Sequence, residues 1–141
     1  DDFDMVIGTR TAKDLIWSGA NMGHFLRWGN WAVAKMLEAL FSGPSLTDVG
    51  CTMRLIKREC LDRIQGQFTV TSSHFLPEMT TLAILNGLRI VEIPLNYRER
   101  VGTSKITGEM LKAFSVGMNM IFLILGYRLR SWFTGKYENR D

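Results

Sequence analysis

The chain has 141 residues, enough for one domain with a substantial core, and 46% of them are hydrophobic and 22% charged. This composition is typical of a folded globular protein and excludes a disordered one. The formal net charge of +3 argues only weakly about partners, and we expect no nucleic-acid partner. Cys51 and Cys60 are too few for a disulfide scaffold, so we expect reduced thiols in the cytoplasm.

The first half of the chain predicts a strand followed by a helix. Residues 4–8 are an apolar run that ends in glycine, which predicts a buried strand, and the polar residues 9–23 predict a loop. Apolar residues at helical spacing predict a helix over residues 24–41, ended by Gly43 and Pro44. The chain opens on Asp1 without a signal peptide. We interpret this start as a cut through a longer protein.

The second half predicts further strands and helices in alternation. We expect a strand near residues 52–56, a short helix over 59–64, and either strand or loop over 68–73. A helix from Phe75 should stop at Asn86 and Gly87, and a strand over 88–97 should have Pro94 at an edge or end. A loop over 98–108 and a long helix over 109–132 follow. This alternation predicts an α/β layered fold, with too few strands for a complete sheet.

The segment over residues 46–54 combines a carboxylate, a glycine and a guanidinium within a predicted loop. The Asp48 side chain can accept hydrogen bonds from nearby N–H groups, and Gly50 permits a positive φ or a close approach to a ligand. Arg54 can hold a carboxylate or a phosphate with its paired donors. The alternative is a turn closed by an Asp48–Arg54 ion pair.

The loop over residues 98–108 offers cations, hydroxyls and two glycines directly before a predicted helix. Glycines let backbone N–H groups approach a phosphate, and a helix N-terminus adds a favourable dipole. This pattern predicts a phosphate-binding loop, and the alternative is a solvated basic turn. The order of residues excludes a Walker motif.

Other candidate residues each have a structural alternative. Arg10 follows the first predicted strand, where α/β sheets carry ligands, although such a residue can also form a surface ion pair. Arg27 and Asn30 lie one turn apart on the first helix, on what could be a solvated face. Glu78 lies in the first turn of a helix, where the helix dipole would explain it. His24 and His74 lack metal-ligand spacing, and we expect structural roles for both.

Several motifs together resemble the C-terminal half of a family 2 glycosyltransferase, in the branch of the dolichol- and polyprenol-phosphate sugar transferases. In chain order the motifs are DMVIGTR (4–10), Arg27-x-x-Asn30, TDxGxxxR (47–54), Phe75-x-x-Glu78, EIP (92–94) and RVGTSK (100–105). The resemblance implies a partial GT-A fold with a mixed sheet flanked by helices. It also implies inverting transfer from a nucleotide sugar to a lipid-phosphate or other glycan acceptor, such as a cell-envelope glycan.

The resemblance also implies a divalent cation, Mg²⁺ or Mn²⁺, held by an Asp-x-Asp motif that would lie before Asp1. The 141 residues alone should therefore be inactive, and we predict no metal ligand among them. Within this chain the implied substrate-binding residues are Arg10 and Arg27 for the acceptor phosphate, Arg54 and Glu78 in the site, and Arg100, Ser104 and Lys105 over the donor phosphates.

The implied chemistry depends on the acceptor. An acceptor phosphate is already ionised and needs little help from a base, whereas a hydroxyl acceptor would need a carboxylate, for which Asp48 is the catalytic candidate. Cations would stabilise the charge that develops on the leaving group. The rival interpretation is a non-catalytic α/β module that binds phosphate or anionic lipid.

The C-terminal part suggests contact with a membrane surface. Residues 113–125 are apolar apart from Ser115 and Asn119, a run too short for the roughly 20 residues of a bilayer span, and basic residues follow. An amphipathic helix lying in the membrane interface would suit a lipid-linked acceptor, and packing on the sheet is the alternative. We therefore divide the chain into an acceptor-side half over 1–108 and a helix with a basic tail over 109–141. We expect the protein at the cytoplasmic face of a membrane.

Overall fold

The computed structural model describes residues 2–10, 24–96 and 110–134. Strand β1 (Met5–Thr9) is central in a small mixed sheet, antiparallel to β2 (Arg54–Ile56) and parallel to β3 (Ile90–Pro94). The helices are α1 (His24–Phe41), α2 (Arg58–Ile64), α3 (Phe75–Leu85) and α4 (Met110–Thr134), and the short 3₁₀ turn η2 (Gln65–Gln67) follows α2. These ranges confirm the predicted α/β fold and its mixed sheet.

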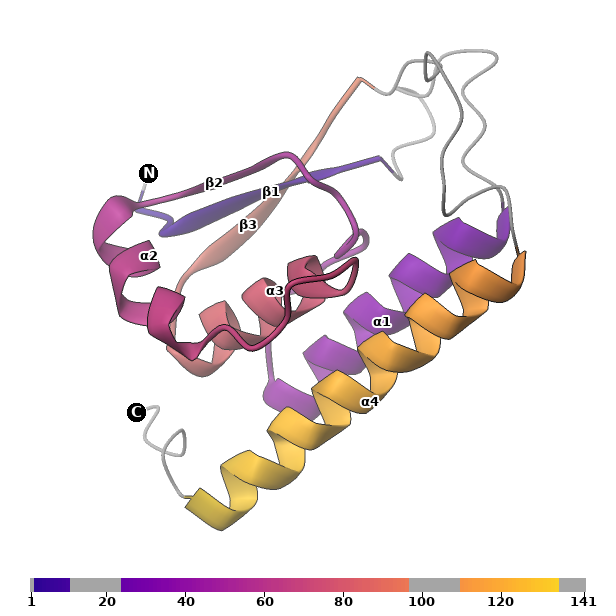
Figure 1. Ribbon diagram of the computed structural model, residues 1–141. Helices are drawn as coiled ribbons and strands as arrows, with labels where there is room; N and C mark the ends of the chain where they lie inside the picture. The colour runs from indigo at the N-terminus through magenta and orange to yellow at the C-terminus, as the bar shows by residue number, and fades with distance from the viewer. Residues whose placement is uncertain (1, 11–23, 97–109, 135–141) are drawn as a thin grey trace.

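One face of the sheet packs on the helices. In Figure 1 the helices lie on one side of the three strands. Met5 and Ile7 on β1 are fully buried. Alternate residues of a strand point to the same face, and the face that carries these two residues is the one that the helices cover. The register places Arg54 and Glu92 on either side of Ile7 on this same face. Leu55 belongs to the opposite face and is 72% exposed.

Helix α3 is the central helix of the described part. All side chains over residues 77–85 are buried, as expected for a helix that is apolar on nearly every side. Its two buried threonines satisfy their hydroxyls on the preceding turn, Thr80 on the Leu76 carbonyl and Thr81 on the Pro77 carbonyl. The helix ends as predicted, because Gly87 takes φ +72° and the Leu88 N–H donates to the Ala83 carbonyl.

Helices α1 and α4 run side by side and both contact α3 (Figure 1). Ile124 on α4 is fully buried in the core. Helix α4 therefore packs on helices α1 and α3. The predicted alternative, in which it packs directly on the sheet, is wrong. Its opposite side carries exposed apolar residues, which leaves the interfacial alternative open.

Most element boundaries agree with the sequence prediction. Helix α1 has the predicted limits, and residues 68–73 form a loop. Strand β3 is shorter than predicted, because Leu88 belongs to the turn after α3 and the pairing with β1 ends at Thr9 and Pro94. Helix α4 extends two residues further than predicted.

Candidate functional site

The candidate site lies at the edge of the sheet where β1 and β3 end. Because these strands are parallel, their carboxyl ends meet at one edge, which is where open α/β sheets bind ligands. Arg10 follows β1 directly, and the loop after α1 brings Asp48 to the same place. The structure thus joins two predicted site residues that are 38 positions apart in sequence.

Arg10 and Asp48 form a two-pronged ion pair. The Arg10 Nε donates to Asp48 Oδ2 at 2.7 Å, and Nη2 donates to Oδ1 at 2.8 Å. The backbone N–H of Arg10 also donates to Oδ2, at 3.2 Å. The Asp48 side chain is fully buried and that of Arg10 is 17% exposed. Paired bonds of this kind fix the plane of the guanidinium as well as its position. The pair therefore presents Arg10 in one defined orientation.

Arg54 has a different environment from the one that an Asp48–Arg54 ion pair would require. Its Nε donates to the Cys51 carbonyl at 3.0 Å, and Nη1 donates to the Leu76 carbonyl and the Thr80 hydroxyl at 2.8 Å each. Its Nη2 donates to the Val49 carbonyl. The alternative of a turn closed by Asp48 and Arg54 is therefore wrong, since Asp48 pairs with Arg10.

These contacts make Arg54 an internal connector between the loop over 46–53 and helix α3. Burial lowers the pKa of the Arg54 guanidinium to about 10, so the group still carries its charge at neutral pH. Its predicted role in substrate binding stays a prediction.

Glu92 on β3 belongs to the EIP motif (92–94), but the sequence pattern predicted no role for its side chain. Its carboxylate accepts the Thr47 N–H at 2.9 Å, the Thr47 hydroxyl at 2.7 Å and the Asp48 N–H at 2.8 Å. The Thr9 hydroxyl lies 3.0 Å from that of Thr47. The signal in the sequence that could have identified Glu92 is its position as a single charged residue within the apolar strand IVEIP.

Gly50 permits a close approach, though to the protein itself. A Cβ added to Gly50 would lie 2.5 Å from Asn30 Oδ1, so the glycine lets the α1 side chain pack against the loop backbone. Arg27 is half-buried and lies three residues before Asn30, on the same side of α1. This side of α1 therefore faces the loop that carries Asp48.

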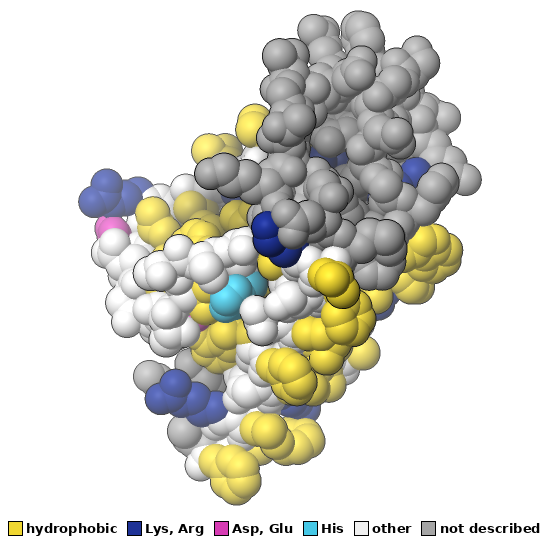
Figure 2. Space-filling model, turned by 45° about the vertical axis from the view of Figure 1, so that its right-hand side comes forward, with side chains coloured by type: hydrophobic (Ala, Val, Ile, Leu, Met, Phe, Trp, Pro, Cys, Tyr) yellow, Lys and Arg dark blue, Asp and Glu magenta, His cyan; other side chains and the backbone are white. Residues whose placement is uncertain are grey.

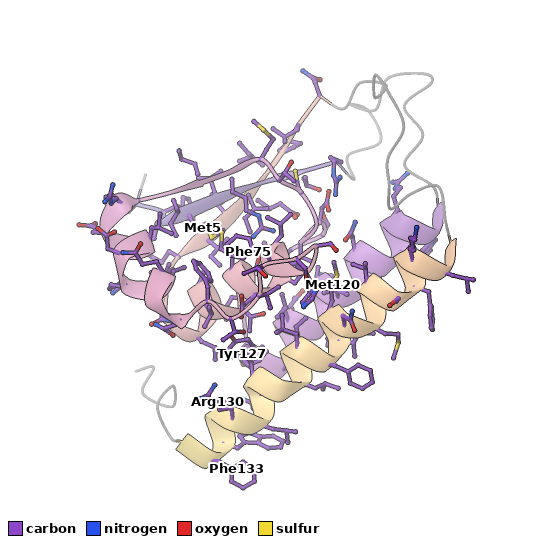
Figure 3. All side chains as sticks on the ribbon, viewed as in Figure 1. Met5, Phe75, Met120, Tyr127, Arg130 and Phe133 are labelled. Carbon is purple, nitrogen blue, oxygen red and sulfur yellow. The ribbon has the colours of Figure 1, made fainter. Side chains whose placement is uncertain are left out.

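Glu78 is fully buried and satisfied by hydrogen bonds within the protein. Its carboxylate accepts the Thr69 N–H and hydroxyl, the Val70 N–H and the Tyr127 hydroxyl. Burial raises its pKa, but these hydrogen bonds outweigh burial and leave the pKa below its ordinary value. Figure 3 shows Tyr127 on the side of α4 that faces α3, whereas Phe133 points away. Glu78 thus ties α4 to the loop before α3, and its predicted role in the site stays a prediction.

The remaining predicted residues are not tested by this geometry. Arg100, Ser104 and Lys105 lie outside the described residues. Within the described ranges, no three His, Cys, Asp or Glu side chains gather in a way that could hold a metal ion. The expected divalent cation stays a prediction.

Comparison with known proteins identifies a distant relative. The chain is 28% identical over 130 residues to a dolichyl-phosphate hexose transferase of Haloferax volcanii. The match covers 92% of this chain and 53% of the relative, so the chain spans about half of that protein's length. No protein-family model matches the chain, and no solved structure matches it. The similarity suggests a glycosyltransferase-like relative.

Proposed function

We propose that this chain is the acceptor-side half of a family 2-like glycosyltransferase with a GT-A fold, which transfers a sugar from a nucleotide sugar to a lipid phosphate with inversion. The observation that carries the proposal is the match to a dolichyl-phosphate hexose transferase over 92% of the chain. The geometry supports it, because a fixed guanidinium stands at the edge of the sheet where α/β proteins bind ligands.

In this proposal Arg10 binds the acceptor phosphate and Asp48 orients Arg10. Both Asp48 oxygens accept hydrogen bonds from Arg10, so the pair offers a phosphate directed N–H donors at a defined position. An acceptor phosphate is itself the nucleophile and needs little general-base help. Arg27 adds a second cation from the side of α1 that faces the Asp48 loop. Asp48 as a base for a hydroxyl acceptor is the alternative.

The donor side of the proposal rests on the sequence. Arg100, Ser104 and Lys105 would bind the donor diphosphate, and a divalent cation held by upstream carboxylates would neutralise the leaving group. The chemistry that such a cation supplies when bound is stabilisation of the developing negative charge. The residues described here orient the acceptor.

The proposal is tested by sugar transfer from nucleotide sugars to dolichyl phosphate with the whole protein. Arg10→Ala should lower kcat/KM for the acceptor by roughly ten- to a hundredfold, since a charge-assisted hydrogen bond contributes on the order of 1.5–3 kcal/mol. Arg63→Ala, at an exposed position on α2, is the matched control and should change little. A wild-type protein that binds anionic lipid but transfers no sugar would favour the non-catalytic module.

Membrane-surface contact is the second part of the proposal. The outer side of α4 exposes seven large apolar residues, namely Leu111, Phe114, Phe122, Leu125, Leu129, Trp132 and Phe133. Figure 2 shows hydrophobic side chains gathered along the lower part of the molecule, where α4 lies. Helix α1 adds exposed Trp28 and Trp31. Among the described residues, no helix combines the length and apolarity needed to cross a bilayer. We propose that α4 lies along the membrane surface.

Vesicle flotation tests this contact. The double change Phe122→Ser and Leu129→Ser should lower binding to anionic vesicles by about tenfold or more, because each side chain loses apolar area that the bilayer would cover. Leu55→Ser is the control, since Leu55 is also exposed but lies on the sheet. Equal flotation of the double variant, the control and the unchanged protein would contradict the membrane role of α4.

A further inference from the structure

Glu92 holds the backbone N–H groups of Thr47 and Asp48 in the turn that carries Asp48. Its side chain stands on the helix-facing side of β3, beside Ile7. A half-buried carboxylate is costly unless its oxygens are hydrogen-bonded. Glu92 makes no ion pair within the described ranges, and its bonds go to two consecutive backbone N–H groups and one hydroxyl. The carboxylate is therefore used to fix the conformation of the turn.

The hydroxyls beside Glu92 form a directed chain. Thr47 Oγ1 donates its hydrogen to Glu92 Oε2 at 2.7 Å. Since Thr47 has only one hydroxyl hydrogen, the 3.0 Å contact between Thr9 and Thr47 leaves Thr9 as the donor. The order is thus Thr9 to Thr47 to Glu92. This chain joins the end of β1, immediately before Arg10, to the turn that carries Asp48.

We propose that Glu92 is a positioning residue that sets the Asp48 carboxylate and, through it, the orientation of the Arg10 guanidinium. The backbone N–H of Asp48 donates to Glu92. The Asp48 carboxylate accepts hydrogen bonds from Nε, Nη2 and the backbone N–H of Arg10. The proposal rests on the function proposed above for its effect on transfer. Its structural part, the fixing of Arg10, is independent of that function.

The kinetic test compares Glu92→Ala, Glu92→Gln and Thr47→Val in the whole protein. Alanine removes every bond to the turn and should lower kcat/KM for dolichyl phosphate by about tenfold or more, with the KM for the donor unchanged. Glutamine keeps one carbonyl oxygen for the two N–H groups and should recover activity to within about threefold. Thr47→Val removes the hydroxyl chain but keeps both backbone N–H bonds to Glu92, and it should give an intermediate loss with an unchanged melting temperature. Parallel losses for donor and acceptor in all three variants would overturn the proposal.

A second measurement does not depend on transfer activity. The exchange of the Arg10 Nε–H with solvent, followed by ¹H–¹⁵N NMR and assigned through Arg10→Lys, should accelerate at least tenfold in Glu92→Ala. The Arg54 Nε–H, which donates to the Cys51 carbonyl, is the internal control and should not change. Unchanged exchange at Arg10, or equal acceleration at both sites, would overturn the proposal. If the unchanged protein transfers no sugar but Arg10 alone loses protection, the proposed function fails and the positioning role stands.

Discussion

Replacing Asp48 with alanine should lower kcat/KM for the acceptor at least a hundredfold and the free energy of unfolding by about 3 kcal/mol. Asp48 is fully buried and holds Arg10 through two side-chain bonds, and Arg10 is itself only 17% exposed. Removal of the carboxylate takes a charged partner and both side-chain bonds to it away from a guanidinium in a largely buried place. That loss costs more than the removal of an exposed ion pair, which is worth about 0–1 kcal/mol.

Asp48→Asn separates the two roles that the carboxylate could have. Asparagine keeps one oxygen to accept from Arg10, so an orienting role predicts partial activity. A general base predicts that activity is lost, because the amide cannot take up the proton of a hydroxyl acceptor. The measurements are steady-state kinetics and denaturant unfolding. Asp62→Ala is the control, because Asp62 forms an exposed pair with Arg58. An Asp48→Ala protein with unchanged stability and kinetics would contradict both roles.

Arg54→Ala should destabilise the protein by about 4 kcal/mol, which corresponds to a fall of about 10 °C or more in Tm. Arg54 donates to three backbone carbonyls, on Val49, Cys51 and Leu76, and to the Thr80 hydroxyl. Each buried acceptor that loses its donor costs about 1–3 kcal/mol. Lysine cannot restore this set of bonds, because its single ammonium cannot reproduce the planar fork of a guanidinium.

The control for Arg54 is Arg58→Ala, four residues further along the chain. Arg58 is 86% exposed at its side chain and forms an exposed pair with Asp62 on the same helix, so its removal should cost little. Thermal unfolding of both variants gives the comparison. An Arg54→Ala protein that unfolds at the original temperature but binds the acceptor poorly would instead support the predicted role of Arg54 in the site.

Local chemistry explains why most elements could be predicted. Three features depend on residues close together in sequence, and each forms where it was expected. They are the apolar residues at helical spacing in α1, the end of α3 at Gly87 and the apolar run of β1. The order and relative directions of the strands were harder to predict from the sequence, because strand pairing depends on residues that are far apart along the chain. The order β2–β1–β3 joins segments separated by more than thirty residues.

The partners of the charged side chains could be determined only from the tertiary structure. Asp48 and Arg54 are close in sequence and suggested each other as partners, but strand β2 carries Arg54 onto the core face of the sheet. Arg10 reaches Asp48 only because the loop after α1 returns to the end of β1. Glu92 lies in a strand whose pattern shows an interrupted apolar run and nothing of the turn that it holds.

The sequence by itself determined most of the helices and strands, and it placed Arg10 directly after the first strand. These properties follow from hydrophobic periodicity, helix caps and turn residues, all of which act over a few positions. Only the tertiary structure decided that Arg10 pairs with Asp48, that Arg54 binds carbonyls and that Glu92 holds the turn between them. Hydrogen bonds form between atoms about 3 Å apart in space, and the residues that meet at this range around the mixed sheet are far apart along the chain.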